Sequence, residues 1–155
     1  MAATTLFTIG YEGATVASFL DALRAAGVRL LVDVRALASS RRPGFAKTAL
    51  SANLASIDIE YLHLRGLGTP ADGRAAARAG RHDEMKRIFL EHMTRDVAQE
   101  ELERLAEIIR GGRPVCLMCF EADPSHCHRS LVVEALQSLV SFDVVHLFAK
   151  DEWEE

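Results

Sequence analysis

The chain has 155 residues, of which 49% are hydrophobic and 26% are charged, and its formal net charge at pH 7 is −4. This length and balance fit one globular domain, spanning residues 1–155, that buries a real core. The negative charge argues against a surface wholly devoted to nucleic acid, although it leaves room for a local basic patch. Because the sequence contains neither a membrane-length apolar segment nor a secretory signal pattern, we expect a soluble, cytoplasmic protein with no membrane partner.

The cysteine content predicts a reduced protein. Cys116, Cys119 and Cys127 are odd in number and lie within twelve consecutive residues. That arrangement is a poor framework for a secreted, disulfide-bonded scaffold. We therefore expect free thiols.

Five short apolar runs rich in β-branched and aromatic residues predict strands. They are Thr5–Ile9, Leu30–Val34, Ile59–Leu64, Pro114–Phe120 and Phe142–Phe148.

Helical patterns separate these runs. The clearest one follows Thr15, a suitable N-cap, and ends at Gly27, a suitable C-cap. A second helix is expected over Lys47–Ser56, and a longer helical stretch over Asp83–Arg110, where Thr94 is a candidate new N-cap.

The last helix is expected to follow Cys127, and the preceding Asp123 and Pro124 fit an N-cap and a proline at the first helical position. Two long segments, 36–46 and 65–81, are interpreted as loops, and long loops in compact domains often carry function. The alternation of strands and helices favours a single three-layer, Rossmann-like α/β domain with a mostly parallel five-stranded sheet.

Polar residues follow the predicted strands at the edge where open α/β sheets bind ligands. Several of them are arginines, and nearby glycines and a helix start offer backbone N–H groups, a combination that suits an anionic and especially a phosphate-bearing ligand. The residues expected to bind it are Gly10, Tyr11, Arg35, Ser40, Arg41, His63 and Arg129. A cap, a turn or a solvated surface charge is the ordinary alternative for each residue taken singly.

The segment 116–130 contains residues that could bind a metal ion or act as a nucleophile. If 114–120 is a strand, Cys116 and Cys119 point to opposite faces, so their spacing does not make a metal site. A metal, if bound, would use Cys119, Cys127 and His128. Otherwise Cys127, beside a helix start, histidines and an arginine, is a candidate nucleophile, although it lacks the spacing of a thiol phosphatase. The expected catalytic groups are Cys127, His128, Glu121 and Asp33.

Four segments carry a resemblance to a known family: TIGYEG, LVDVRALASSRRPGFAK, IEYLHLRGLGTP and CLMCFEADPSHCHR. Together they resemble the domain-of-unknown-function 488 family over almost the full chain. A proline common in the family is replaced by the run 36–38, and Cys116 looks peculiar to this chain. The resemblance implies this signature set: Gly10, Tyr11, Asp33, Arg35, Ser40, Arg41, Phe45, Tyr61, His63, Leu67, Gly68, Cys119, Glu121, Cys127, His128 and Arg129.

The family has no established activity, so the resemblance implies a site and names neither a reaction nor a cofactor. The leading hypothesis is a small enzyme acting on a phosphate-bearing substrate, such as a nucleotide or nucleic acid. Two alternatives stay open at this point. One is a binding module for the same ligands without catalysis, and the other is a metal-binding or redox thiol protein.

Overall fold

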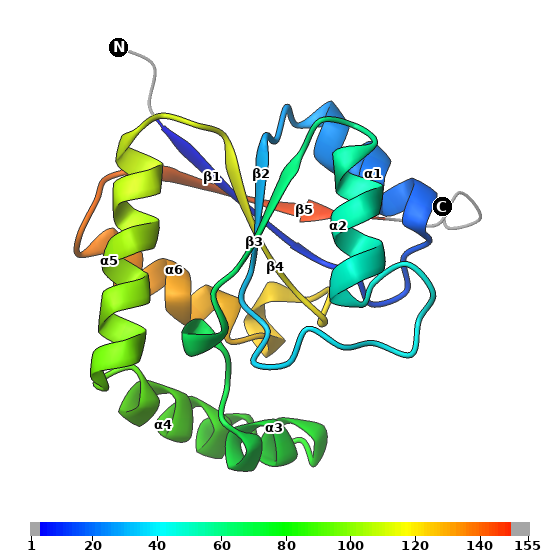
Figure 1. Cartoon of the computed structure of the whole chain (residues 1–155). Coiled ribbons are helices and arrows are strands. Elements are labelled where there is room, and N and C mark those ends of the chain that lie inside the picture. Colours follow the sequence, from blue (N-terminus) through cyan, green and yellow to red (C-terminus); the bar gives the residue numbers. More distant parts are fainter. Residues whose placement is uncertain (1–3, 150–155) are drawn as a thin grey trace.

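The computed structural model describes residues 4–149 as an α/β domain built on one parallel sheet (Figure 1). The sheet order is β3-β2-β4-β1-β5, and every neighbouring pair is parallel. The strands are β1 (Thr5–Gly10), β2 (Leu30–Asp33), β3 (Glu60–His63), β4 (Val115–Cys119) and β5 (Asp143–Phe148). Each strand overlaps one of the predicted apolar runs. Such runs are expected in a sheet covered on both faces, because both sides of its strands are buried.

Helices cover both faces of the sheet and form a three-layer domain, as predicted. On one face, α1 (Val16–Ala25) and α2 (Lys47–Ala55) pack against alternate strand residues such as Leu31 and Met118. On the other face, α5 (Asp96–Arg110) and α6 (Arg129–Gln137) pack against the intervening residues, such as Val32 and Leu117. The period-two alternation of strand side chains therefore divides the core into two clusters.

The stretch 83–110, predicted to be helical with a possible break at Thr94, forms two helices, α4 (His82–His92) and α5. The Thr94 hydroxyl donates to the Glu91 carbonyl at 2.7 Å, so Thr94 closes the end of α4. Its predicted role as N-cap is wrong, because Arg95 occupies that position.

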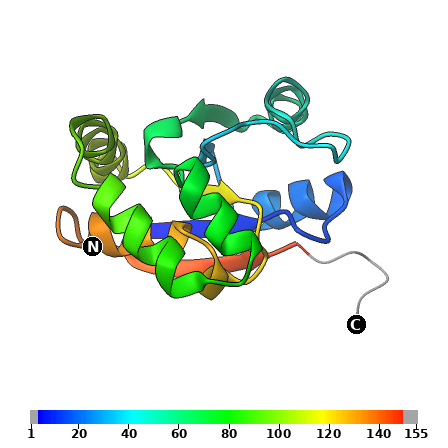
Figure 2. The same ribbon diagram turned by 90° about the horizontal axis from the view of Figure 1, so that it is seen from below.

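The segment 65–81, interpreted as a loop, contains a 3-10 turn, η1 (Arg65–Leu67), and a helix, α3 (Ala71–Arg78). Alanines favour this helix, and Gly73 lets it approach α4 closely. A methyl group on Gly73 would lie 3.2 Å from a side-chain carbon of Ile88. Figures 1 and 2 show α3 and α4 beyond the lower end of the sheet, across the ends of the strands.

The last helix follows Cys127, as predicted, but Asp123 is not its N-cap. Asp123 caps a short 3-10 turn, η2 (Pro124–His126), where its carboxylate accepts from the Ser125 amide at 2.9 Å. Cys127 is then extended, and α6 begins at Arg129 after His128. The interruption at Cys127 turns its side chain toward the end of β4.

Candidate functional site

The carboxyl ends of β1, β2 and β4 border a pocket of about 490 Å³. Tyr11 lines it after β1 and Arg35 after β2, while Cys119 and Glu121 line it at the end of β4. His128, the residue directly before α6, lines it as well. The structure thus brings five of the residues singled out from the sequence to one cavity, at the edge of the sheet where they were expected.

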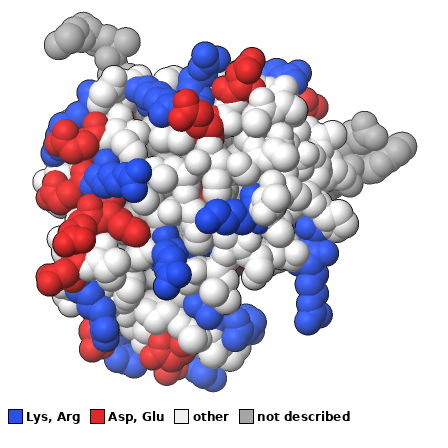
Figure 3. Space-filling model, in the orientation of Figure 1, with Lys and Arg blue, Asp and Glu red and all other residues white. Residues whose placement is uncertain are grey.

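The opposite wall of the pocket comes from the segment that sequence analysis treated as a loop. Arg74 and Arg78 of α3 line it, together with Met85 of α4. These two arginines were missed, and the Gly- and Arg-rich composition of 65–81 was the only signal for them. Figure 3 shows Lys and Arg side chains spread over the lower part of this face, around α3 and α4, while Asp and Glu gather at the left over α5.

Asp33 and Arg35 form a buried ion pair beneath the pocket. The Asp33 carboxylate is fully buried and accepts from Arg35 Nη2 at 2.7 Å, Arg35 Nε at 2.9 Å and the Tyr61 hydroxyl at 2.6 Å. Arg35 also donates to the Tyr11 hydroxyl at 3.2 Å and to the Phe45 carbonyl at 2.9 Å. Most of the donors of Arg35 therefore serve the protein itself.

This ion pair also shifts the pKa values of Arg35 and Tyr61. Burial by itself lowers the pKa of Arg35, but the hydrogen bonds and charges of Asp33 and Tyr11 more than offset it and raise that pKa. Burial, followed by the Asp33 hydrogen bond and charge, raises the pKa of Tyr61. At neutral pH both groups therefore keep their protons and donate to the Asp33 side chain, a scaffolding arrangement.

The segment after β2 is tied down by residues expected to contact ligand. His63 Nε2 lies 2.7 Å from the Arg35 carbonyl oxygen, and Ser40 Oγ accepts from the Arg42 amide at 3.1 Å. Arg42 donates to the carbonyls of Tyr11 and Ala14.

Several of the predicted ligand-binding residues do not line the pocket. Arg41 is exposed, and neither it, His63 nor Ser40 belongs to the pocket wall. Gly10 instead packs against the turn after β4, where a methyl group on it would lie 1.8 Å from the Glu121 carbonyl oxygen.

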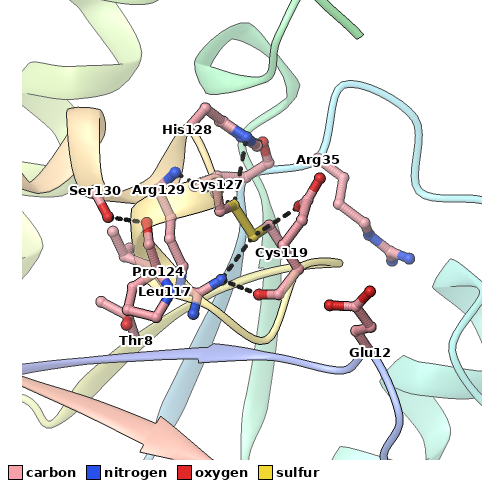
Figure 4. The surroundings of a disulfide bond; sticks show 12 residues. Thr8, Glu12, Arg35, Leu117, Cys119, Pro124, Cys127, His128, Arg129 and Ser130 are labelled. Carbon is pink, nitrogen blue, oxygen red and sulfur yellow. Dashed lines mark hydrogen bonds between the residues drawn. A yellow bond between two sulfur atoms is a disulfide. The ribbon is translucent and has the colours of Figure 1, made fainter. Parts of the chain in front are cut away.

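Cys119 and Cys127 form a disulfide in this structure, so the expectation of three reduced thiols is wrong for this pair (Figure 4). Their Cα atoms are 7.3 Å apart, across the turn that returns the chain from β4 to α6. Cys116 is free and fully buried in the core cluster on the other face of the sheet, as alternation along β4 predicted. Burial raises the pKa of the Cys116 thiol.

Arg129 lies fully buried against the two sulfur atoms. Its Nη1 is 3.0 Å from Cys119 Sγ, and its backbone N–H points to Cys127 Sγ at 3.5 Å. The guanidinium also donates to the backbone carbonyls of Glu121 and Ala122. Burial lowers the pKa of Arg129 to about 10, so it is still a cation at neutral pH.

His128 and Glu121 complete the surroundings of the sulfurs. His128 Nε2 lies 2.7 Å from the Val34 carbonyl oxygen, and its Nδ1 lies 3.7 Å from Cys127 Sγ. Burial lowers the pKa of His128 to about 4, which keeps the imidazole neutral at physiological pH. Glu121 Oε2 lies 3.7 Å from Cys119 Sγ.

A comparison with family models places this site in a known group. The family described as domain of unknown function DUF488 matches residues 15–136, a span that contains β2, the cysteine segment and all but the last residue of α6. The chain belongs to this family. No curated protein and no solved structure gives a significant match.

Most of the site of this DUF488 protein falls inside the matched span. Asp33, Arg35, Cys119, Cys127 and Arg129 lie within it, whereas the end of β1 precedes it. In the part of the protein that the structure describes, no helix has the length and apolar character needed to cross a membrane.

Proposed function

We propose that this DUF488 protein is a small thiol-dependent enzyme that binds an anionic substrate in the pocket and exchanges thiols and disulfides with it. The observation that carries the proposal is the pairing of Cys119 with Cys127 beside the buried guanidinium of Arg129. Cys119 belongs to the pocket wall and Cys127 does not. We therefore assign Cys119 as the thiol that attacks the substrate disulfide, and Cys127 as the thiol that then attacks the mixed disulfide.

The exchange proceeds in two balanced steps. The Cys119 thiolate attacks one sulfur of a substrate disulfide, whose S–S bond breaks and releases one thiolate, leaving a mixed disulfide on Cys119. Cys127 then loses its proton to solvent and attacks Cys119 Sγ, forming the Cys119–Cys127 disulfide and releasing the second substrate thiolate. The substrate gains two electrons, the cysteine pair loses two, and an external dithiol restores the pair.

The residues beside the two sulfurs support these separate roles for Cys119 and Cys127. Arg129 Nη1, 3.0 Å from Cys119 Sγ, stabilises negative charge on the attacking sulfur. His128 Nδ1, 3.7 Å from Cys127 Sγ, is an acceptor that orients the Cys127 thiol. His128 keeps the catalytic role expected from the sequence, whereas Arg129, expected to bind the ligand, serves a sulfur instead, and Cys119 takes the place of Cys127 as nucleophile.

The pocket wall supports an anionic substrate with an apolar body. Arg74 and Arg78 line it on one side, and Phe120, which is 42% exposed, lines it on the other beside Tyr11. Guanidinium groups bind carboxylates and phosphates alike. A phosphate-bearing substrate, the leading sequence-based hypothesis, therefore fits the same wall as a carboxylate would.

The test uses two small disulfides of opposite charge. Reduced protein is mixed with anionic, aromatic dithiobis(nitrobenzoate) or with cationic cystamine, and thiolate release and protein mass are followed. We expect Cys127→Ala to accumulate the mixed disulfide and Cys119→Ala to lose the fast reaction, with Cys116→Ala as the matched control that behaves as wild type. Fast reaction of Cys119→Ala contradicts the proposal.

The charge of the pocket is tested with the same reagents. Arg78→Gln should slow the anionic disulfide several-fold and leave the cationic one unchanged or faster, because it removes one positive charge from the wall. Inorganic phosphate and nucleotides are added as competitors. Slowing by phosphate would favour the phosphate-bearing substrate, whereas equal rates for both disulfides in wild type would rule out an anion-selective pocket.

A further inference from the structure

The sulfurs of Cys119 and Cys127 and a ring nitrogen of His128 lie within 4.8 Å of one another, and all three residues are buried. Cys119 ends β4, while Cys127 and His128 precede α6, so two separate elements supply the three atoms. Among the side chains that the structure describes, which leave out that of His126, this is the one group of three or more thiols, imidazoles and carboxylates close enough to share an ion. Figure 4 shows the two sulfurs joined in the disulfide, with the His128 side chain beside Cys127.

The tautomer of His128 suits a ligand. Its Nε2 is 2.7 Å from the Val34 carbonyl oxygen, and a carbonyl only accepts, so Nε2 carries the proton. Nδ1 is then left with its lone pair, 3.7 Å from Cys127 Sγ. Metal-ligating histidines characteristically donate their other ring N–H to a carbonyl or carboxylate, which fixes the ring in the binding orientation.

The spacing of the backbone at the two cysteines lets the sulfurs separate once the disulfide is reduced. Their Cα atoms are 7.3 Å apart, whereas disulfides usually span roughly 4.4 to 6.8 Å. The nearby guanidinium of Arg129 can donate to a metal-bound thiolate, because its Nη1 already points to Cys119 Sγ. The negative charges of two thiolates partly neutralise the positive charges of the ion and of the Arg129 guanidinium.

We propose that the reduced protein binds one thiophilic divalent cation, Zn²⁺, through Cys119 Sγ, Cys127 Sγ and His128 Nδ1. Two thiolates and one imidazole match the soft and borderline ligands that zinc prefers. Cys119 and His128 both line the pocket, so the fourth position of a tetrahedral ion faces the cavity, where water or a substrate group can fill it.

Metal binding and disulfide formation exclude each other, because both use the same sulfur electrons. When a thiol oxidant such as diamide takes two electrons from the two metal-bound thiolates and two protons from solvent, it becomes the hydrazine, the disulfide forms and the ion is released. This inference uses the thiols of the proposed function but does not require exchange to occur. The metal titration measures bound ion and the exchange assay measures thiolate release, so one proposal can be refuted without the other.

The test titrates Zn²⁺ into protein reduced with a phosphine and measures binding against a chromophoric chelator. Co²⁺ serves as a spectroscopic probe, because thiolate ligands give an intense charge-transfer band. We expect one ion per chain in wild type and in the matched control Cys116→Ala. Cys119→Ala and Cys127→Ala should each weaken binding by roughly 100-fold or more, and His128→Gln by roughly 10-fold or more. Diamide should release the ion from wild type.

Three outcomes would overturn the proposal. These are no bound metal in reduced wild type, a cobalt spectrum without thiolate charge transfer, and binding that survives diamide oxidation. The last two are measured on wild type, so they do not depend on any variant folding. Circular dichroism of each variant shows whether a loss of binding reflects the ligand or the fold.

Discussion

Replacing Asp33 with alanine should destabilise the protein strongly, because it leaves the guanidinium of Arg35 buried without its partner. Arg35 is only 6% exposed, and Asp33 is fully buried. Removing one member of a buried, hydrogen-bonded ion pair costs on the order of 3 to 5 kcal/mol. The Tyr61 hydroxyl, 2.6 Å from the Asp33 carboxylate, loses its acceptor as well. We therefore expect the upper part of that range.

Urea denaturation of reduced protein measures this free energy of unfolding. Tyr61→Phe removes one donor and leaves the ion pair intact, so about 1 to 2 kcal/mol is expected there. Asp21→Ala is the matched control, because that carboxylate lies exposed on α1, and its change should stay within about 0.5 kcal/mol.

The same experiment distinguishes a scaffold from a catalytic carboxylate. A loss below about 1 kcal/mol for Asp33→Ala, with thiol chemistry abolished, would refute the scaffolding role and restore Asp33 as a catalytic candidate. Normal thiol reactivity in the folded fraction of a strongly destabilised variant would support that role.

Three further predictions concern the surroundings of the sulfurs. Gly10→Ala should cost roughly 1 to 3 kcal/mol in urea denaturation, because its methyl group meets the Glu121 carbonyl, whereas Gly111→Ala should change little. Arg129→Lys should slow the reaction of Cys119 with anionic disulfide by about tenfold; an unchanged rate would contradict thiolate stabilisation by the guanidinium. Because burial raises the pKa of the Cys116 thiol, the unfolded chain loses that proton first, so stability should fall as pH rises above about 9 in wild type but less in Cys116→Ala.

Sequence alone determined the layers of this protein and the edge where its polar residues gather. Apolar runs such as 30–34 predicted buried parallel strands because both faces of such strands lie against helices. The same reasoning correctly put Cys116 and Cys119 on opposite faces of β4, since strand side chains alternate. These features depend on local periodicity, which a sequence displays directly.

Only the tertiary structure decided which polar residues meet. Local composition did not show that 71–78 forms a helix, because the close packing of Gly73 on α4 comes from residues distant along the chain. Nor did spacing show that Arg35 would be held by Asp33 rather than by ligand, or that the turn over 120–126 would bring Cys127 to Cys119. Such choices depend on the path of the chain between elements and on competition among burial, hydrogen bonding and charge. Arg74 and Arg78 entered the pocket wall for the same reason, since α3 and α4 fold back across the strand ends.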